Sequence, residues 1–401
     1  MRVILGVGAG IAAYKACELL RLLSESGHRV RVVPTPDALR FVGEATWAAL
    51  SGEPASTTTW DDVHEVPHVR LGQGADLVIV APATADVMAR AAAGLSGDLL
   101  TAVLLTARCP VTYAPAMHTE MWEHPATRAN VATLRSRGAI VIDPASGRLT
   151  GADSGPGRLP DPAELFAVAQ RLLARGSAGL AADLAGRHVL VTAGGTREEL
   201  DPVRFIGNWS SGRQGYALAS TAAARGATVT LISANVALPD PAGARLIRVR
   251  SALELRDAAL AAAAQADALV MAAAVADYRP SVRSEHKLKK GGGPPEPVRL
   301  TENPDILREL SRDRQRPRQV IAGFGAETGD LLANGTAKLA AKGCDLLVVN
   351  QVGAGLAFGT SDNEALILAA DGAQQRVPRG PKEALADVIW DLVAARLPAA
   401  G

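Results

Sequence analysis

The chain has 401 residues, of which 48% are hydrophobic and 21% charged, and its formal net charge is +1. This length suits about two or three domains, and the balanced charge gives no electrostatic reason to bind nucleic acid or a membrane surface. The N-terminus reads as a strand and a glycine turn rather than a signal peptide, and no run of about 18 apolar residues occurs. The three scattered cysteines form no disulfide framework, so we expect a reducing, cytoplasmic compartment. The balanced charge and the lack of a long apolar run lead us to expect neither membrane nor nucleic-acid partners.

The first part of the chain alternates short apolar runs with amphipathic segments. A helical stripe over Ala12–Ser26 ends at Gly27. The expected strands are Val3–Val7, Arg29–Val33, Leu77–Val80, Val111–Ala114 and Ile140–Ile142. Strands that alternate with helices indicate a parallel sheet covered by helices on both faces.

The same pattern restarts after a stretch of small residues at 174–186. Helices are expected over Tyr216–Ala224 and Ala384–Ala395. The expected strands are Val189–Thr192, Val229–Ile232, Leu246–Val249, Leu269–Ala272, Val320–Ala322 and Leu346–Val349. We therefore predict an α/β fold of two doubly wound, mostly parallel-sheet, Rossmann-like domains in tandem, over residues 1–180 and 187–401.

A glycine turn joins the first expected strand to the first helix. Gly8 and Gly10 would let backbone N–H groups approach a phosphate at the helix N-terminus. Ile11 replaces the third glycine of the dinucleotide fingerprint, and the second strand lacks a terminal acid, so NAD is disfavoured and a mononucleotide is permitted. A turn that serves packing alone is an equal alternative.

Two further segments follow strand ends in this domain. Residues 81–86 and 114–118 lie where open α/β sheets bind ligands, so they should converge with the glycine turn on one crevice. His68 precedes a strand and is either catalytic or structural. With His64 and Asp62 it does not show the ligand spacing of a metal site, so we favour a solvated loop there.

Six ordered segments carry a family resemblance over residues 1 to about 170. They are GAGIAAYK, PHVRLGQGAD, APATAD, GLSGDLLT, APAMHTEMW and GRLTGADSGPGRL. Together they resemble flavin-dependent cysteine decarboxylases, in particular phosphopantothenoylcysteine decarboxylases. The resemblance implies bound FMN, which oxidises the cysteine side chain, allows its carboxylate to leave as CO₂ and then returns the electrons.

The same resemblance suggests individual roles. It makes His68 the general base at the flavin edge and places His118 at the substrate carboxylate. With the two glycines of the turn, the candidate flavin-binding residues are Gly8, Gly10, Thr35, Ala83, Thr84, Pro115 and Met117.

Two positions depart from the family pattern. His118 stands where the family usually has asparagine, and Gly151 stands where the family has the cysteine that protonates the product. We expect His118 to replace that proton donor, with water or Asp153 as alternatives. A flavin-binding regulatory protein with an inactive decarboxylase domain is the alternative function.

Lysines are concentrated in one part of the second domain. The chain has 35 arginines and 7 lysines, and five of the lysines are Lys287, Lys289, Lys290, Lys338 and Lys342. A lysine ammonium suits a polyphosphate, although a solvated surface is the alternative. Residues 283–297 read as a mobile loop, and no P-loop motif occurs.

Two more features of this domain suit an anionic ligand. Asp277, at a strand's carboxyl end, suits a divalent cation between phosphates, or else an ion pair with Arg279. Ser210 or Ser211 precedes a helix, either as an N-cap or beside backbone donors for an anion.

Motifs from about residue 188 onward resemble phosphopantothenate–cysteine ligases. They are GGTREELDPVRFIGNWSSGRQG, AAAVADYRP, KLKK, ENPDIL, AGFGAET and KLAAKGCDLLVVN. The resemblance implies that CTP with Mg²⁺ activates 4'-phosphopantothenate as an acyl-cytidylate and that the amine of cysteine then displaces CMP.

The ligase resemblance also implies site residues. Asn208 would act on the acyl-cytidylate, and Asp277 would face the metal. The implied CTP contacts are Met271, Ala272, Ala273, Asp277, Lys287, Asn303, Pro304, Asp305, Ile306, Phe324, Lys338 and Lys342.

Both halves together resemble the bifunctional CoaBC family of coenzyme A biosynthesis. That family implies a homo-oligomer. A tandem nucleotide-binding dehydrogenase is the competing enzyme class.

Overall fold

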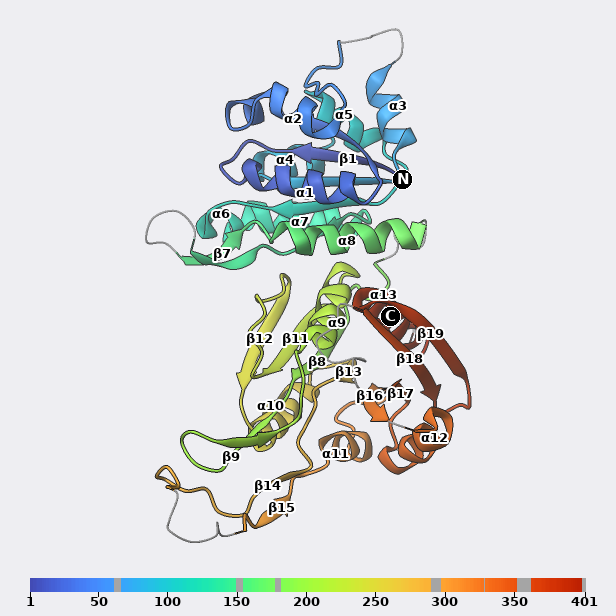
Figure 1. Cartoon of the computed structure of the whole chain (residues 1–401). Helices are drawn as coiled ribbons and strands as arrows, with labels where there is room; N and C mark the ends of the chain where they lie inside the picture. Colours follow the sequence, from blue (N-terminus) through green and yellow to red (C-terminus); the bar gives the residue numbers. More distant parts are fainter. Residues whose placement is uncertain are drawn as a thin grey trace. The chain divides into compact units, whose positions relative to one another are not determined.

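A computed structural model describes residues 1–60, 66–148, 154–176, 182–289, 297–327, 329–351 and 362–398. The chain forms two compact units (Figure 1). Unit 1 comprises Met1–Asp183 with Ala223–Gly226 and Asp240–Gly243, and unit 2 comprises Leu184–Ala222, Ala227–Pro239 and Ala244–Gly401. In the described residues, no helix has the length and apolar character needed to cross a bilayer.

Unit 1 contains a five-stranded parallel sheet in the order β2-β1-β3-β4-β5. Its strands are β1 (Arg2–Val7), β2 (Arg29–Pro34), β3 (Leu77–Ala83), β4 (Val111–Pro115) and β5 (Ile140–Val141). The chain runs from β1 outward to β2 and then returns to β3 on the other side of β1. The strand order therefore reverses between β1 and β3, which creates a crevice at the carboxyl ends of these strands.

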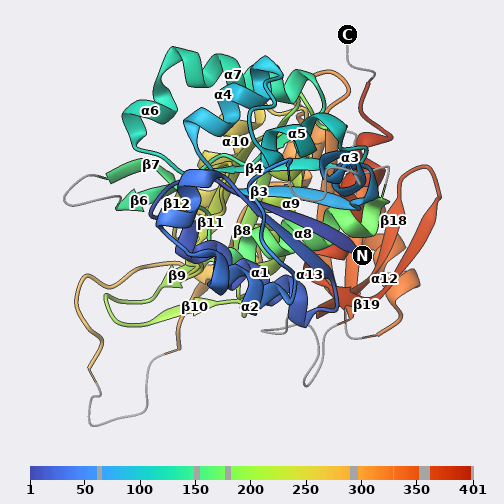
Figure 2. The same ribbon diagram turned by 90° about the horizontal axis from the view of Figure 1, so that it is seen from above.

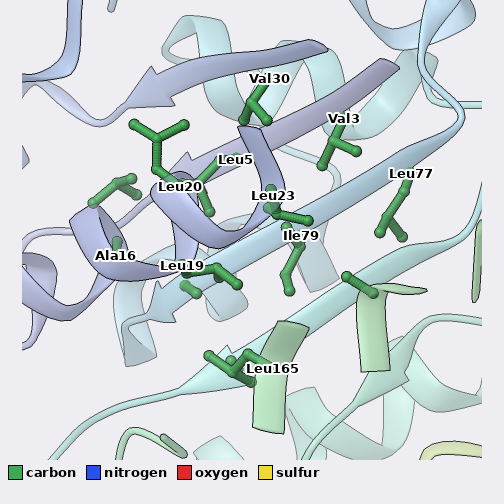
Figure 3. Packing of buried hydrophobic residues seen from close by; sticks show 14 of the residues in the cluster. Val3, Leu5, Ala16, Leu19, Leu20, Leu23, Val30, Leu77, Ile79 and Leu165 are labelled. Atoms are coloured by element: carbon green, nitrogen blue, oxygen red, sulfur yellow. The ribbon is translucent and has the colours of Figure 1, made fainter. Parts of the chain in front are cut away.

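Helices cover both faces of this sheet because its strands are apolar on both sides. They are α1 (Ala13–Glu25), η1 (Pro36–Arg40), α2 (Glu44–Ser51), α3 (Pro67–Gly74), α4 (Ala85–Ala93), α5 (Leu99–Thr106), α6 (Thr119–Glu123), α7 (Pro125–Ser136) and α8 (Pro162–Arg175). The predicted stripe of α1 is buried, and Figure 3 shows its leucines against Val3 and Leu5 of β1 and Ile79 of β3, with Leu165 of α8 beside them. Ile4 of β1 points to the opposite core, under α4, α5 and α7.

A short antiparallel ribbon follows β5. It consists of β6 (Ala145–Arg148) and β7 (Ser154–Arg158). The segment between these strands, with Gly151 and Asp153, lies outside the described residues, as do Asp62 and His64.

Unit 2 contains an eight-stranded sheet in the order β12-β11-β8-β13-β16-β17-β18-β19. Its strands are β8 (His188–Gly194), β11 (Thr228–Ala234), β12 (Ala244–Val249), β13 (Ala268–Met271), β16 (Val320–Glu327), β17 (Leu346–Gln351), β18 (Asp362–Ala369) and β19 (Gln374–Pro381). The first six strands in chain order are parallel and have the doubly wound Rossmann arrangement, which reverses between β8 and β13. The sequence did not predict the antiparallel strands β18 and β19.

The remaining elements of unit 2 are five helices and two ribbons in the described residues. The helices are α9 (Arg213–Ala224), α10 (Ala252–Ala263), α11 (Ile306–Arg312), α12 (Leu331–Lys342) and α13 (Lys382–Ala394). The ribbons pair β9 (Arg197–Glu199) with β10 (Phe205–Gly207), and β14 (Tyr278–Pro280) with β15 (Leu300–Glu302). Both ribbons lie outside the large sheet and were not predicted (Figure 1).

Candidate active sites

A cavity of about 800 Å³ opens at the reversal point of the unit 1 sheet. Its walls come from the segments that follow β1, β2, β3 and β4, together with the starts of α4 and α5 and the end of β7. It brings together five residues predicted from the sequence, namely Gly10, Thr35, Thr84, Met117 and His118. Gly8, Ala83 and Pro115 are not on its wall but belong to the strand ends and turn that shape it.

The two predicted glycines have different roles. The N–H of Gly8 donates to the carbonyl of Pro82 at 2.9 Å, and a Cβ on Gly8 would lie 2.7 Å from that oxygen. Gly8 is therefore required for close packing of the β1 turn against β3, and its N–H is not available to a phosphate. A Cβ on Gly10 would meet only Thr84 Cγ2 at 4.0 Å, so Gly10 borders the cavity with space to spare.

Thr84 places the N-terminus of α4 at the cavity wall. Its side chain caps the helix by accepting a hydrogen bond from the N–H of Val87 at 3.3 Å. Lys15, Arg90 and Arg158 also line the cavity. Asp37, Asp86 and Asp98 line it too, and Arg90 pairs with Asp86, so the charged side chains are balanced and it is the helix N-terminus that favours an anionic group.

Thr35 carries a buried polar atom that needs a partner. It follows β2, is 8% exposed and lines the cavity, and its Oγ1 makes no hydrogen bond. A buried hydroxyl is normally hydrogen-bonded. A ligand with polar edges and an anionic end would satisfy both Thr35 and the N-terminus of α4.

His118 presents an imidazole to this cavity. Its carbonyl accepts hydrogen bonds from the first turn of α6, but its side chain makes no capping bond. β7 holds the preceding residue, because the N–H of Met117 donates to the carbonyl of Gly157 at 3.0 Å. The backbone is thus fixed while the imidazole remains exposed and able to move a proton.

His68 does not line this cavity. It lies in α3, a helix that the sequence did not predict, and its carbonyl accepts a hydrogen bond from Thr106 Oγ1 at 2.8 Å. Thr106 ends α5, whose other end reaches the cavity at Asp98, about 12 Å away along the helix. Within one chain, His118 therefore lines the cavity and His68 does not.

The second candidate site lies at the reversal point of the unit 2 sheet. Residues 272–277 form the loop after β13. Two threonines, one on each side of the glycine pair Gly194–Gly195, accept hydrogen bonds from the backbone of this loop. Thr192 Oγ1 accepts from the N–H of Ala273 at 3.1 Å, and Thr196 Oγ1 accepts from the N–H of Ala276 at 2.9 Å.

Two predicted asparagines fasten the same loop. Asn208 Nδ2 donates to the carbonyl of Val275 at 2.9 Å, and Asn303 Nδ2 donates to that of Ala276 at 2.8 Å. Asp277 is exposed, and Arg279 donates to Asn303 Oδ1 at 3.1 Å and to the carbonyl of Glu302. The alternative of a buried Asp277–Arg279 ion pair is therefore wrong, and Asp277 is accessible to a ligand.

The α12 lysines reach toward the same edge of the sheet. Lys338 Nζ lies 3.5 Å from Glu327 Oε1 at the end of β16, and Lys342 Nζ lies 2.6 Å from Asp305 Oδ2 at the start of α11. The Lys338 stem lies over Gly325, where a Cβ would meet its Cδ at 3.3 Å.

The other predicted nucleotide contacts differ in exposure. Met271 and Ile306 belong to the buried core, so only their backbone can face a nucleotide. Phe324, Ala272, Ala273 and Pro304 are half-buried. Lys287 is exposed, whereas Lys290 lies outside the described residues.

Comparison with known proteins decides the family. The profile described as "Flavoprotein" matches residues 1–174, and that described as "DNA/pantothenate metabolism flavoprotein C-terminal domain" matches residues 184–397. A protein named "Coenzyme A biosynthesis bifunctional protein CoaBC" from Mycolicibacterium smegmatis is 58% identical over 405 residues, which cover 99% of this chain and 98% of the relative. The protein of that name from Vibrio cholerae is 41% identical and covers 98% and 97% of the two chains.

The chain belongs to the CoaBC family. It is a bifunctional coenzyme A biosynthesis protein with an N-terminal flavoprotein decarboxylase domain and a C-terminal ligase domain. The dehydrogenase alternative is therefore wrong. Among solved structures, the C-terminal domain of a CoaBC protein aligns with TM-score 0.46 and 32% identity, covering 54% of this chain and 97% of that one.

None of the three cysteines of this CoaBC chain lines the unit 1 cavity. Burial raises the pKa of the Cys17 and Cys109 thiols above the ordinary value, and neither residue lines the flavoprotein cavity. Cys344 is buried in unit 2. His118, next to Met117, is the histidine among the titratable side chains that line this cavity.

No preformed metal cage exists among the described residues, because no three His, Cys, Asp or Glu side chains gather in a ligand-like group. A cation that is already bound to the phosphates of a ligand needs only one or two protein carboxylates, so the single carboxylate of Asp277 suits such a cation.

The sequence places Thr192 and Thr196 at a glycine turn beside a crevice, but it gave neither threonine a role in holding the loop after β13. It also missed Gly325 and Glu327, which surround Lys338.

Proposed function

We propose that this CoaBC chain makes 4'-phosphopantetheine in two consecutive reactions. Unit 2 joins cysteine to 4'-phosphopantothenate with CTP, and unit 1 then decarboxylates the product with FMN. The observation that supports the proposal is that residues of the decarboxylase motifs line a cavity at the reversal point of the unit 1 sheet, while residues of the ligase motifs gather around the loop after β13 at the reversal point of the unit 2 sheet.

In the ligase reaction, the substrate carboxylate attacks the α-phosphorus of CTP, which forms an acyl-cytidylate and releases pyrophosphate. The cysteine amine then attacks the acyl carbon, and CMP leaves. Lys287, Lys338 and Lys342 supply positive charge for the triphosphate, and Asp277 faces its Mg²⁺. Asn208, fixed through Val275, keeps its Oδ1 for the reacting group.

FMN fits the unit 1 cavity. The volume, the unpartnered Thr35 hydroxyl, the α4 N-terminus and the apolar wall suit a flavin mononucleotide with one anionic end. The strand order β2-β1-β3-β4-β5 is the flavodoxin-like order, for which an FMN site at the β1/β3 reversal is the known precedent. When bound, FMN supplies two-electron oxidation of the cysteine side chain and its reversal.

The chain's own residues hold the substrate and move protons. Met117 contacts the substrate, and His118 orients its carboxylate and later donates the proton that completes the product. His68 acts as general base from a second copy of the chain, since its own chain holds it away from the cavity.

A homo-oligomer in the cytoplasm is part of this proposal. Beside His68, Val66 at the start of α3 and Leu105 near the end of α5 are 45% and 56% exposed. These exposed apolar side chains lie on the two elements that the hydrogen bond from Thr106 to His68 joins, and such a surface suits contact with another chain. The small-molecule substrates require neither nucleic acid nor a membrane.

The deciding experiment incubates the purified protein with CTP, Mg²⁺, cysteine and 4'-phosphopantothenate, and identifies the products by mass. We expect pyrophosphate, CMP, CO₂ and 4'-phosphopantetheine, and heat should release FMN rather than FAD. Ligation product without CO₂ would instead support the regulatory alternative, in which unit 1 binds flavin but is inactive.

A variant tests the nucleotide assignment. Lys287→Gln should raise the KM for CTP while decarboxylation of supplied phosphopantothenoylcysteine stays at the wild-type rate. Arg312→Gln removes an exposed positive charge from the same unit and is the matched control. An unchanged KM in Lys287→Gln would favour a solvated lysine loop.

A further inference from the structure

A buried aspartate lies in the turn between β9 and β10. The Asp201 side chain is fully buried, and its Oδ1 accepts hydrogen bonds from the N–H groups of Val203 and Arg204, both at 2.8 Å. Its Oδ2 accepts from Nε and Nη2 of Arg204 at 3.0 and 2.6 Å. Burial opposes ionisation, but the guanidinium and the backbone donors outweigh it and hold the pKa of Asp201 well below its usual range.

The Asp201–Arg204 pair also holds a distant segment of the chain. The N–H of Leu288 donates to Asp201 Oδ2 at 3.1 Å, and Arg204 Nη2 donates to the carbonyl of Leu288 at 2.5 Å. Both backbone polar groups of Leu288 are therefore bound by one ion pair, which we call the Asp201–Arg204 clasp. The residues on either side of Leu288 are Lys287 and Lys289.

Two further contacts tie the same segment to the hairpin. The N–H of Ser284 donates to the carbonyl of Leu200 at 2.9 Å, and Arg283 pairs with Glu199 at 2.6 Å. Figure 2 shows the segment running beside the β9–β10 hairpin. The described part of the loop expected to be mobile, up to residue 289, is thus anchored.

The clasp has a consequence for Lys287. Its ammonium is exposed, and a lysine on a mobile segment loses much conformational entropy when it binds a phosphate. Fixing the backbone of the next residue removes part of that loss before the ligand arrives. The hydrogen bonds from Val203 and Arg204 are enough for Asp201 to stabilise the turn. The two further hydrogen bonds to the Leu288 backbone therefore have a role beyond turn formation.

We propose that the Asp201–Arg204 clasp presents Lys287 to the triphosphate of CTP, which makes Asp201 a positioning residue of the ligase site. The proposal rests on the proposed function of unit 2. It concerns residues 87 positions apart in sequence, joined by the Leu288 backbone.

The first test measures the clasp without nucleotide. Limited trypsin digestion of the full chain, followed by mass spectrometry, gives the rate of cleavage at the Lys287–Leu288 bond. Asp201→Asn loses the charge that binds Arg204 and should increase this rate by about 10-fold or more, because local opening controls proteolysis of native protein.

A matched control exists in the same unit. Asp345 accepts from the N–H of Ile321 at 2.7 Å and from Arg314 at 2.8 and 3.1 Å, but it holds no part of the lysine segment. Asp345→Asn should leave cleavage at Lys287–Leu288 within about 2-fold of wild type. Unchanged decarboxylation in both variants shows that unit 1 is intact.

The second test measures the consequence for CTP. Asp201→Asn should raise the KM for CTP by about 10-fold to 100-fold with a small change in kcat, since a displaced binding group weakens capture of the ligand. In the Lys287→Gln background, Asp201→Asn should add little to KM, because Asp201 acts through Lys287. Asp345→Asn should leave the KM unchanged.

Each outcome bears on the proposal. Unchanged cleavage in Asp201→Asn would overturn the clasp, and faster cleavage with unchanged KM would overturn its role in CTP binding. Fully additive effects of Asp201→Asn and Lys287→Gln on KM would show that Asp201 acts independently of Lys287, against the proposal. A wild-type protein that does not consume CTP would overturn the proposed ligase function, while the digestion would still decide whether the clasp exists.

Discussion

Lys342 Nζ lies 2.6 Å from Asp305 Oδ2, which joins the end of α12 to the N-cap of α11. Both residues were predicted from the sequence to contact the nucleotide. The pair is partly exposed, with side-chain exposures of 25% and 39%, so its contribution to stability is about 1 kcal/mol or less.

Lys342→Met should therefore separate binding from stability. The KM for CTP should rise by about 10-fold, because a charge-assisted bond to phosphate is stronger than an exposed ion pair, while the free energy of unfolding falls by less than about 1 kcal/mol. Arg256→Met, which breaks the pair between Arg256 of α10 and Glu309 of α11, should leave the KM unchanged. An unaltered KM in Lys342→Met would mean that the lysine only holds Asp305. Steady-state kinetics and urea unfolding measure the two quantities.

Gly8 and Gly10 offer a second matched pair. Gly8→Ala places a methyl group 2.7 Å from the carbonyl oxygen of Pro82, so the β1 turn must shift, at a cost of about 1–3 kcal/mol. Gly10→Ala meets only Thr84 Cγ2 at 4.0 Å. We expect Gly8→Ala to lower both thermal stability and flavin content, and Gly10→Ala to keep the stability. Equal stability of the two variants, measured by calorimetry, would contradict the packing role of Gly8.

His118→Asn restores the residue that the decarboxylase family usually has. If His118 is the proton donor, this variant should release CO₂ and then stop before the product is complete, because Gly151 stands where the family has its proton-donating cysteine. Trapped CO₂ and the mass of the accumulated substrate-derived species measure the two stages. A normal yield of 4'-phosphopantetheine would transfer the role to water or Asp153.

Complementation tests the shared decarboxylase site. His68→Asn and His118→Asn should each fail to complete the reaction. Co-expressed as mixed oligomers, they should regain roughly a quarter of wild-type product formation, because random pairing places an intact His68 beside an intact His118 in that share of sites. No recovery in isolated mixed oligomers would place His68 outside the partner's site.

Asp201 predicts a pH dependence for unit 2. Its pKa is lower in the folded chain than the unfolded value of about 3.9. The unfolded state therefore binds the proton more readily, so the stability from ionised Asp201 is complete above about pH 5 and is lost as the pH falls toward its folded pKa. Asp201→Asn should show a shallower loss of stability over this range. Hydrogen exchange of peptides from β8 and β13, measured during urea unfolding, reports unit 2 alone; an identical pH profile would contradict the assignment.

Local sequence periodicity predicted the parts of the fold that each segment determines by itself. The stripe of α1 and the apolar run of β1 appear where expected, because a buried face requires apolar residues at the helical or extended repeat. The helix α3 was missed because it is short, starts at Pro67 and carries His68 with few apolar positions. The strand β18 was missed although its apolar run, residues 365–369, is a strand signal, whereas β19 has few apolar residues and is marked as part of the sheet by its pairing with β18.

The sequence by itself determined the family, the two-domain α/β class and the residue types at both sites. Motifs and lysine usage are properties of short stretches of sequence, so they can be recognised without knowing which stretches are in contact. Tertiary structure alone decided which of those residues meet. It assigned Gly8 to packing and Gly10 to the cavity, placed His118 but not His68 at that cavity within one chain, and joined Asp201 to Leu288. These relationships depend on contacts between segments far apart in sequence, whose geometry follows from how the sheets and hairpins pack and not from any local pattern.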